Sequence, residues 1–417
     1  MVGRYGRGVP SRLIYTMNRL FQSKSGTNYL FPFILIATLY LLWGCAHGLL
    51  DVLNKQFQDI FSMSKAESGF VQFSVYIGYF IMALPAGIIM RKVGYKKGLI
   101  TGLLLFAFGA LLFIPAAMAN SPYTFFVALF ILACGLCIIE NGAHPCATGM
   151  GPEDGAARRI NIAAAFNGVG WIVGPLIGTW LILGGTGENF DIAKPYILVA
   201  AVVLLVCLLL CFIRLPEREM AEELVAEAEQ TIQPATSSIW QHKGFKYALI
   251  AQFLYVGAQT GVNSFFINYA TELDPSISKA TAGLLLSFGG MGLFFVGRLL
   301  SSLFMKWVAP GKLLAWFGLL ATVCMALVMM EVGKVSIVAL FLTFFFMSTM
   351  FPTIFALGVK GMGAHTKKAS SYLVMCIVGG AVFPICMGLI GSTSMAMGFL
   401  LPLIAFLYIT CFALKNR

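Results

Sequence analysis

Charged residues are scarce in this sequence. Only 11% of its 417 residues are charged, against about a quarter in soluble globular proteins, whereas 59% are hydrophobic. A chain with so few polar side chains cannot cover the surface of a water-soluble fold. Because helices satisfy their own backbone hydrogen bonds inside a bilayer, the composition predicts an all-α polytopic membrane protein.

Patterns typical of enzymes, metal sites and disulfide scaffolds are missing too. The ten cysteines all fall in apolar runs, so they predict no disulfide framework, and the Cys134-x-x-Cys137 pair has no second pair of ligands nearby. No phosphate-binding loop or nucleophile elbow occurs. The net charge of +11 comes from short basic clusters between apolar runs rather than from a nucleic-acid-binding surface. We therefore expect no enzyme activity, cofactor, metal or nucleic-acid partner.

Twelve runs are long and apolar enough to cross a bilayer as helices, for which about 20 residues are needed. A polar, acidic and partly helical linker, 214–244, separates a first half, 31–213, from a second half, 245–417. The basic segment 1–30 lacks the compact apolar core of a cleavable signal peptide. The predicted spans are 31–57, 68–90, 98–118, 123–149, 160–183, 192–213, 246–271, 280–305, 313–331, 335–358, 369–391 and 395–414.

Basic residues in the loops predict the orientation. Most of the 28 lysines and arginines, including Arg158 and Arg159, fall on the side of the two termini. The other side holds only Lys55, Lys65, Lys194, Lys279 and Lys334. Because cytoplasmic loops carry the excess of Lys and Arg, both termini are expected in the cytoplasm, which agrees with an even number of spans.

Short motifs recur in the two halves at a nearly constant offset. The matching pairs are "VGWIVGP" from Val169 with "VGGAVFP" from Val378, Pro145 with Pro352, Gly44 with Gly257, and Gly48 with Gly261. These matches predict an internal duplication, which is how many rocking transporters are built. By the same offsets Ser264 is equivalent to Asp51. Pro145 is expected to break its helix, and the repeated glycines 170, 174 and 178 to let helices approach closely.

Acidic side chains occur inside only two spans. The other acids fall at span ends, in loops or in the linker, which leaves Asp51 and Glu140. An isolated carboxylate in hydrocarbon costs about 2.5–3.5 kcal/mol on insertion scales. Two such groups indicate a cavity or a function, and we predict that they bind and release a coupling proton. The alternative is that they only form hydrogen bonds between helices.

Each acid has a histidine four residues away, on the same helical face. His47 precedes Asp51, and His144 follows Glu140. We predict that these histidines tune the acids or bind the substrate, because imidazole both titrates and hydrogen-bonds. Asn141, next to Glu140, is expected to support the same site.

Uncharged polar side chains form stripes at helical spacing. Amide and phenol groups supply the donors and acceptors that a polyhydroxylated neutral ligand needs. The predicted ligand-binding residues on these stripes are Asn54, Gln72, Tyr76, Gln252, Tyr255, Gln259 and Asn263. Hydrogen bonding between helices is the alternative for the stripe on 246–271, and Trp43 and Trp171 fit packing equally well. An anionic ligand would need a buried cation, and Arg298, the one candidate, lies near a span end where snorkelling is expected.

From about residue 30 to 414 the sequence resembles the fucose–proton symporter family of the major facilitator superfamily. The resemblance is carried by "LYLLWGCAHGLLDVLNKQF", "ESGFVQFSVYIGYFIMALPAGIIMRKVGYKKG", "ARRINIAAAFNGVGWIVGPLIG", "AQFLYVGAQTGVNSFFINYA" and "MFPTIFALGVKG". It implies the major facilitator fold, with two pseudo-symmetric six-helix bundles, and roles in proton coupling and sugar recognition for Asp51 and Glu140. Asn167, in one of these stretches, joins the predicted substrate-binding residues.

Three departures from the family pattern bear on the substrate. The family commonly has asparagine where His47 stands, "ETAANP" where this chain has "ENGAHP", and glutamine where it has Ala164. Loss of amides and gain of imidazoles suggest a ligand other than fucose itself, such as another hexose, an amino sugar or a modified sugar.

The sequence therefore predicts a proton-coupled sugar importer of an inner or plasma membrane that works by alternating access. Its expected partners are a small neutral sugar and the lipid bilayer, and we expect a monomer. Sodium stays open as the coupling ion at Asp51. A proton-driven drug or metabolite exporter would instead have a wide apolar pocket, and a non-transporting sugar sensor would bind without flux.

Overall fold

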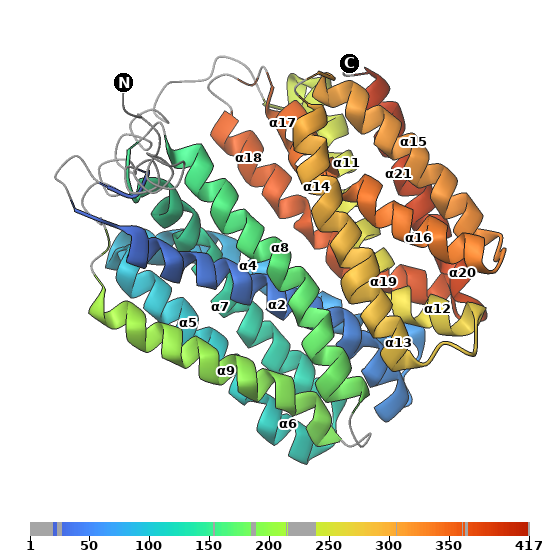
Figure 1. Ribbon diagram of the computed structural model, residues 1–417, viewed down its shortest axis with the longest axis horizontal. Coiled ribbons are helices and arrows are strands. Elements are labelled where there is room, and N and C mark those ends of the chain that lie inside the picture. The colour runs from blue at the N-terminus through green and yellow to red at the C-terminus, as the bar shows by residue number, and fades with distance from the viewer. Residues whose placement is uncertain are drawn as a thin grey trace, which may run out of the picture.

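The structure, a computed structural model, describes residues 20–22, 27–152, 155–184, 189–213, 215, 239–305, 307–360, 362 and 366–415. Apart from short connections, these residues are helical, and the long helices form two bundles (Figure 1). The N-bundle runs from α2 to α9 and the C-bundle from α11 to α21. Most of the basic segment 1–30 and of the linker 214–244 lies outside the described residues, so the helix predicted in the linker stays a prediction.

The N-bundle contains eight α-helices and one π-helical segment within the described residues. They are α2 (Leu30–Ile60), α3 (Lys65–Ser68), α4 (Phe70–Val93), α5 (Tyr95–Leu111), α6 (Phe113–Ala119), α7 (Pro122–Gly149), α8 (Ala156–Gly178), the π-helical Thr179–Leu183 and α9 (Asn189–Phe212). α2 packs against α8, α7 and α4, the helices that carry the remaining predicted site residues of this half.

The C-bundle is divided into more segments. They are a 3₁₀ turn at Ile239–Gln241, α11 (Lys243–Ser264), α12 (Phe266–Leu273), α13 (Lys279–Leu284), the π-helical Leu285–Met291, α14 (Gly292–Phe304), α15 (Pro310–Met329), α16 (Lys334–Met347), α17 (Met350–Val359), α18 (Thr366–Met375), a 3₁₀ turn at Cys376–Val378, α19 (Gly379–Ile390), α20 (Met395–Gly398) and α21 (Leu400–Lys415). The bundles meet where α19 packs on α3 and α4, and where α13 and α14 pack on α8.

Eleven helices in the described part of the chain are long and apolar enough to cross a membrane. They correspond to eleven of the twelve predicted spans. The remaining prediction, 246–271, coincides with α11 and α12, which are broken at Phe265. Its polar side chains, among them Gln252, Gln259 and Asn263, lower the hydropathy of α11, which explains why this segment is not among the eleven.

Glycines join equivalent helices in both bundles. A methyl group added at Gly170 of α8 would collide with the backbone of Leu41 and Cys45 on α2, and one added at Gly174 would also collide with Cys45. In the C-bundle, a methyl group at Gly379 of α19 would meet the backbone of α11 at Phe253. The close packing predicted for the repeated glycines is therefore present, and the same device holds α2 to α8 and α11 to α19.

Pro145 does not break its helix, contrary to the prediction. α7 continues through it to Gly149, and the Thr148 hydroxyl hydrogen-bonds the carbonyl oxygens of His144 and Pro145. A proline removes only one backbone donor, and a nearby hydroxyl can help to satisfy the carbonyl groups around it. The interruption occurs instead in the other bundle, where α16 ends and α17 begins two residues before Pro352.

The assignment of Arg159 to a basic loop implied a solvated side chain, and the structure contradicts it. Arg159 is fully buried at the start of α8. Its guanidinium donates to the carbonyl oxygens of Ala147, Thr148, Pro152 and Leu20, among others. A cation that binds the last carbonyls of a helix complements the helix dipole, so Arg159 anchors the end of α7 that follows Glu140.

Candidate functional site

A small cavity lies between the two bundles, and predicted site residues from both halves line it. α2, α4 and α11 supply six of them: His47, Asp51, Gln72, Tyr76, Gln259 and Asn263. Trp171 of α8 and Thr260 of α11 complete the lining. Two sequence segments about 200 residues apart thus converge on one polar pocket, which we call the central cavity.

Asp51 is the single acidic group in the lining of the central cavity. One carboxylate oxygen, Oδ1, accepts a hydrogen bond from Gln72 Nε2 at 3.2 Å and a long one from Ser264 Oγ at 3.5 Å. The other oxygen, Oδ2, is buried and has no hydrogen-bond partner among the described residues. A carboxyl that is half satisfied in this way can take up a proton or a ligand hydroxyl at Oδ2 without losing its existing contacts.

Cross-bundle and aromatic contacts frame the rest of the central cavity. Thr260 of α11 donates to the Tyr76 hydroxyl of α4 at 3.0 Å, which joins the two bundles. The His47 ring stacks on Trp171, with centroids 5.5 Å apart and planes at 22°. His47 Nε2 hydrogen-bonds the Tyr79 hydroxyl at 3.3 Å. The wall therefore alternates polar groups with flat aromatic faces.

Glu140 lies in a second pocket, between α2 and α7. Tyr40, Trp43 and His144 line this pocket together with apolar residues. His144 Nδ1 hydrogen-bonds the Tyr40 hydroxyl at 2.5 Å, and the two rings stack at 5.3 Å. Each histidine thus pairs with a tyrosine. Within the described residues, no hydrogen bond joins either histidine to the acid four residues away.

Trp43 lies between the two pockets. Its ring meets His47 edge-on at 6.2 Å and His144 at 6.1 Å between centroids. An aromatic wall therefore separates the two acids, so Asp51 and Glu140 belong to distinct microenvironments. That separation was not expected from the sequence.

Besides His144, which lies in the second pocket, five predicted ligand-binding residues do not line the central cavity. The Asn54 amide donates to the Ser264 carbonyl, the Asn167 amide to the Tyr40 carbonyl, and the Tyr255 hydroxyl to the Met347 carbonyl. Gln252 is fully buried, and Asn141 donates to the Cys137 carbonyl of its own helix. For Tyr255 the alternative given for its stripe, hydrogen bonding between helices, describes the contact. Asn54 and Asn167 likewise donate to a backbone carbonyl of another helix, although no such alternative was raised for them.

Sequence reasoning missed Tyr40 and Thr260, and left Trp43 and Trp171 as equally consistent with packing. A signal for two of them was present. Tyr40, Trp43 and His47 continue the Asp51 stripe towards the start of α2 at spacings of three or four residues. Thr260 is adjacent to Gln259, and only the fold reveals that it faces Tyr76 of the other half.

Arg298 is held by the protein rather than extended towards the membrane surface as predicted. Its Nε donates to the Ser348 carbonyl at 3.3 Å, and its guanidinium lies 4.9 Å from the centroid of the Phe294 ring. A cation stacked on an aromatic ring and bound to a carbonyl is retained within the C-bundle. It does not line the central cavity.

The central cavity is too small for a sugar in this conformation. Its volume is about 40 Å³, enough for about three water molecules and far below the roughly 300–1,000 Å³ of typical ligand pockets. A ligand of several hydroxyl groups can enter only if the bundles move apart. The arrangement is therefore a site that opens by relative movement of the two halves.

Comparisons with known proteins agree with this architecture. Residues 32–384 match the Major Facilitator Superfamily. The chain is 36% identical to the L-fucose-proton symporter of Escherichia coli (strain K12), with 94% of each chain covered. It is 31% identical to the glucose/galactose transporter of Brucella abortus, with 94% of this chain and 96% of the relative covered.

A solved structure also matches. The crystal structure of the transporter FucP in the outward conformation has a TM-score of 0.65 at 35% identity and covers 93% of this chain and 99% of that one. The D-xylose-proton symporter has a TM-score of 0.72 at 14% identity, which shows the shared fold alone. The chain belongs to the Major Facilitator Superfamily, within the family that includes the L-fucose-proton symporter and the glucose/galactose transporters.

Proposed function

We propose that this protein is a sugar–proton symporter that imports a neutral hexose or a related sugar by alternating access. The observation that carries the proposal is the central cavity, which places one carboxyl among amide, hydroxyl and aromatic side chains from both bundles. Among the described residues, no lysine or arginine lines it. Such a lining suits many neutral hydroxyl groups and does not suit an anion.

Asp51 is the primary candidate for binding and releasing the coupling proton. Its unpartnered Oδ2 lies in a site lined by both bundles, so its exposure changes whenever the bundles rock. Burial of a carboxyl disfavours its charged form, and alternate access to the two sides then allows loading on one side and release on the other. Glu140 is a second proton or sugar contact, set apart behind Trp43, with His144 held in place by Tyr40.

The remaining candidate residues divide into three groups. His47, Gln72, Tyr76, Gln259 and Asn263 are the proposed direct sugar contacts, because they line the central cavity. Asn54, Asn167 and Tyr255 position helices through hydrogen bonds to carbonyl groups. Gln252 and Asn141 keep their proposed sugar contact only if opening of the bundles uncovers them.

Orientation and assembly follow from charge and from the site. The excess of basic residues on the side of the termini supports a plasma membrane protein with both termini in the cytoplasm. A single chain supplies both walls of the central cavity, so a monomer is a complete transport unit. No cofactor is needed beyond the coupling ion, which we propose to be a proton.

The proposed substrate class is hexoses other than fucose. His47 lines the central cavity and stacks on Trp171, and this is one of the positions at which the chain departs from the fucose–proton symporter pattern. The relatives named as glucose/galactose transporters support a hexose substrate.

The proposal is tested by recording external pH in de-energised cells that express the protein. Fucose, glucose, galactose, amino sugars and anhydrosugars are added in turn. Alkalinisation with one of them establishes proton symport and names the substrate. Uptake that needs sodium and causes no alkalinisation would show that sodium, not the proton, is the coupling ion. Binding without flux would indicate a sensor. Proton movement opposite to the substrate would indicate an exporter.

Trp171 offers a specific prediction for sugar recognition. Replacing Trp171 with alanine removes the aromatic face beside His47, and we expect the KM for the transported sugar to rise about five- to tenfold, by analogy with the loss of an aromatic stacking contact. Trp171→Phe keeps a ring and is expected to stay within about twofold of the wild type. Uptake kinetics in proteoliposomes measure both, and an unchanged KM for Trp171→Ala would contradict the role.

A further inference from the structure

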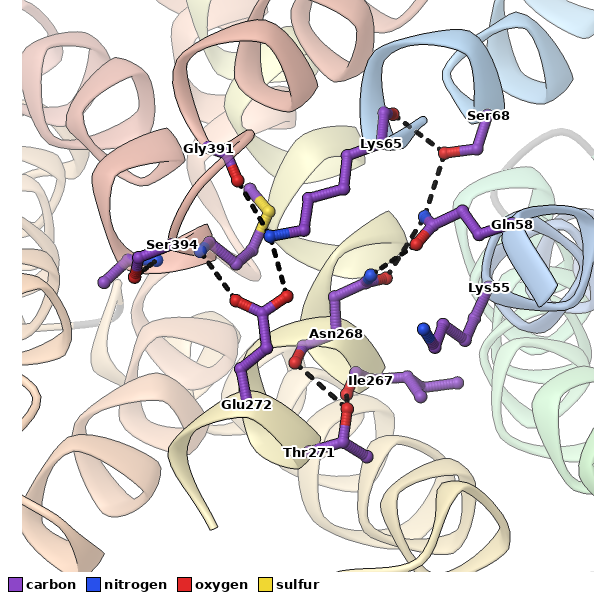
Figure 2. Close-up of polar contacts among 12 residues, drawn as sticks. Lys55, Gln58, Lys65, Ser68, Ile267, Asn268, Thr271, Glu272, Gly391 and Ser394 are labelled. Atoms are coloured by element: carbon purple, nitrogen blue, oxygen red, sulfur yellow. Dashed lines mark hydrogen bonds and ion pairs between the residues drawn. The ribbon is translucent and has the colours of Figure 1, made fainter. Parts of the chain in front are cut away.

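Polar contacts between the two bundles concentrate at the end of the molecule where α12, α13 and α20 lie, away from the C-terminus (Figure 1). Figure 2 shows this region around Lys65, which begins the short helix α3 of the N-bundle. Lys65 Nζ forms an ion pair with Glu272 Oε1 of α12 at 2.7 Å and donates to the Gly391 carbonyl at 2.8 Å. The other Glu272 oxygen accepts the Met395 N–H at 2.8 Å.

Two further pairs join the bundles beside this ion pair. Asn268 Nδ2 donates to Gln58 Oε1 at 2.6 Å, and Gln58 Nε2 reaches Asn268 Oδ1 at 3.4 Å, so the two amides face each other (Figure 2). Lys279 of α13 pairs with Asp59 of α2 at 2.7 Å. We call Lys65–Glu272, Gln58–Asn268 and Asp59–Lys279 the outer latch.

Hydrogen bonds continue from the outer latch to the central cavity. One turn below Gln58, the Asn54 amide donates to the Ser264 carbonyl at 2.9 Å, and the Ser264 hydroxyl approaches Asp51. Ser264 is the residue that the internal repeat makes equivalent to Asp51. Related helices of the two halves thus lie face to face, and the contacts between them run from the surface to the acid.

From these contacts we infer that the outer latch is the gate on the non-cytoplasmic side of the transporter, closed in this conformation. The inference rests on the proposed transport function. A sugar that enters the central cavity from this side must pass between the bundles, and the latch pairs join α2 and α3 of the N-bundle to α12 and α13 of the C-bundle. The latch therefore breaks when the site opens to the outside and reforms behind the bound sugar.

The strength of the contacts fits a gate that opens in every cycle. The Lys65 and Glu272 side chains are 15% and 35% exposed, respectively, and partly solvated ion pairs are individually weak and reversible. The paired amides are neutral and can exchange their partner for water. A fully buried ion pair would be far more costly to break and would hold the protein in one state.

The test measures access from outside to a reporter behind the latch, in intact cells with the full-length protein. The reporter is Ser264→Cys, at a position that is fully buried here, treated with a membrane-impermeant maleimide. The parent without the reporter corrects for the ten native cysteines. Glu272→Gln and Lys65→Met are each expected to speed labelling about two- to fivefold, the effect of losing a partly exposed ion pair.

Asp274→Asn is the matched control. It removes a carboxylate two residues from Glu272, and the Asp274 carboxylate accepts hydrogen bonds from the backbone and hydroxyl of Ser276 in its own loop. Its labelling rate should equal that of the parent. Lys65→Met combined with Glu272→Gln should equal Lys65→Met alone, because Lys65→Met already removes the ion pair. Gln58→Leu, which breaks the amide pair, should also speed labelling. It replaces the charge variants in the test if those variants fail to insert into the membrane.

Unchanged labelling in the latch variants, or an equal increase in Asp274→Asn, would overturn the outer latch. The assay needs no sugar, so the two proposals fail separately. Faster labelling in a protein that moves no sugar keeps the gate and removes the transport function. If the protein transports sugar but the latch variants leave its labelling rate unchanged, the transport function stands and the gate is rejected.

Discussion

Asp51→Asn is expected to abolish sugar-driven alkalinisation while preserving exchange of labelled for unlabelled sugar. Asparagine has the size of the protonated acid, and its carbonyl oxygen can still accept from Gln72 and Ser264 as Asp51 Oδ1 does. It cannot take up or release a proton. The variant should therefore behave as a permanently protonated carrier that moves loaded in both directions but cannot accumulate sugar against a gradient.

The measurement is a pair of assays on the same proteoliposomes: sugar accumulation driven by a pH gradient, and counterflow without a gradient. Glu140→Gln is the comparison, because Glu140 lies in the separate pocket behind Trp43. Loss of accumulation with intact counterflow in Asp51→Asn alone assigns the proton to the central cavity. The same phenotype in Glu140→Gln alone would move it to the second pocket, and accumulation retained in Asp51→Asn would contradict its proposed role.

Gly170→Ala is expected to prevent formation of a stable, active N-bundle. A methyl group at this position would overlap the backbone of Leu41 and Cys45, which cannot move aside as a flexible side chain can. α2 and α8 would have to separate, and with them Asp51 and Trp171, which line the cavity from these two helices. Overpacking of this kind costs about 1–3 kcal/mol even where the structure relaxes.

Gly87→Ala is the matched control, because a methyl group there meets no other atom within 4 Å. Thermal unfolding in detergent and the yield of monodisperse protein should fall markedly for Gly170→Ala. Both should be unchanged or improved for Gly87→Ala, since alanine is the better helix former. Equal stability of the two variants would show that α2 and α8 tolerate separation, against the packing described above.

Much of the architecture could be predicted from residues alone because a bilayer imposes simple requirements. Runs of about 20 apolar residues must be helices, and eleven of the twelve predicted spans reappear as long apolar helices in the described chain. The repeated glycines at positions such as 44 and 170 predicted close packing, which requires only that side chains be absent. The predicted helix break at Pro145 was wrong. A proline marks a place where a helix can break, but the neighbouring groups decide whether it does.

The candidate site could be predicted in part. Spacing along one helix placed His47 and Asp51 on one face, and the structure puts both at the central cavity. Spacing could not tell which polar side chains already bind a neighbour's carbonyl, as Asn54 and Tyr255 do. Nor could it find Thr260, whose partner Tyr76 lies in the other half of the chain.

What the sequence by itself determined is the membrane-spanning character, the twofold internal repeat and the two acids, because each depends on composition or on spacing within one segment. Only the tertiary structure decided that Asp51 and Glu140 occupy separate pockets divided by Trp43, that equivalent helices of the two halves face each other, and that the outer latch joins them. Those facts depend on which faces meet when the bundles pack, and a contact between residues some 210 positions apart has no signature in the local pattern of either.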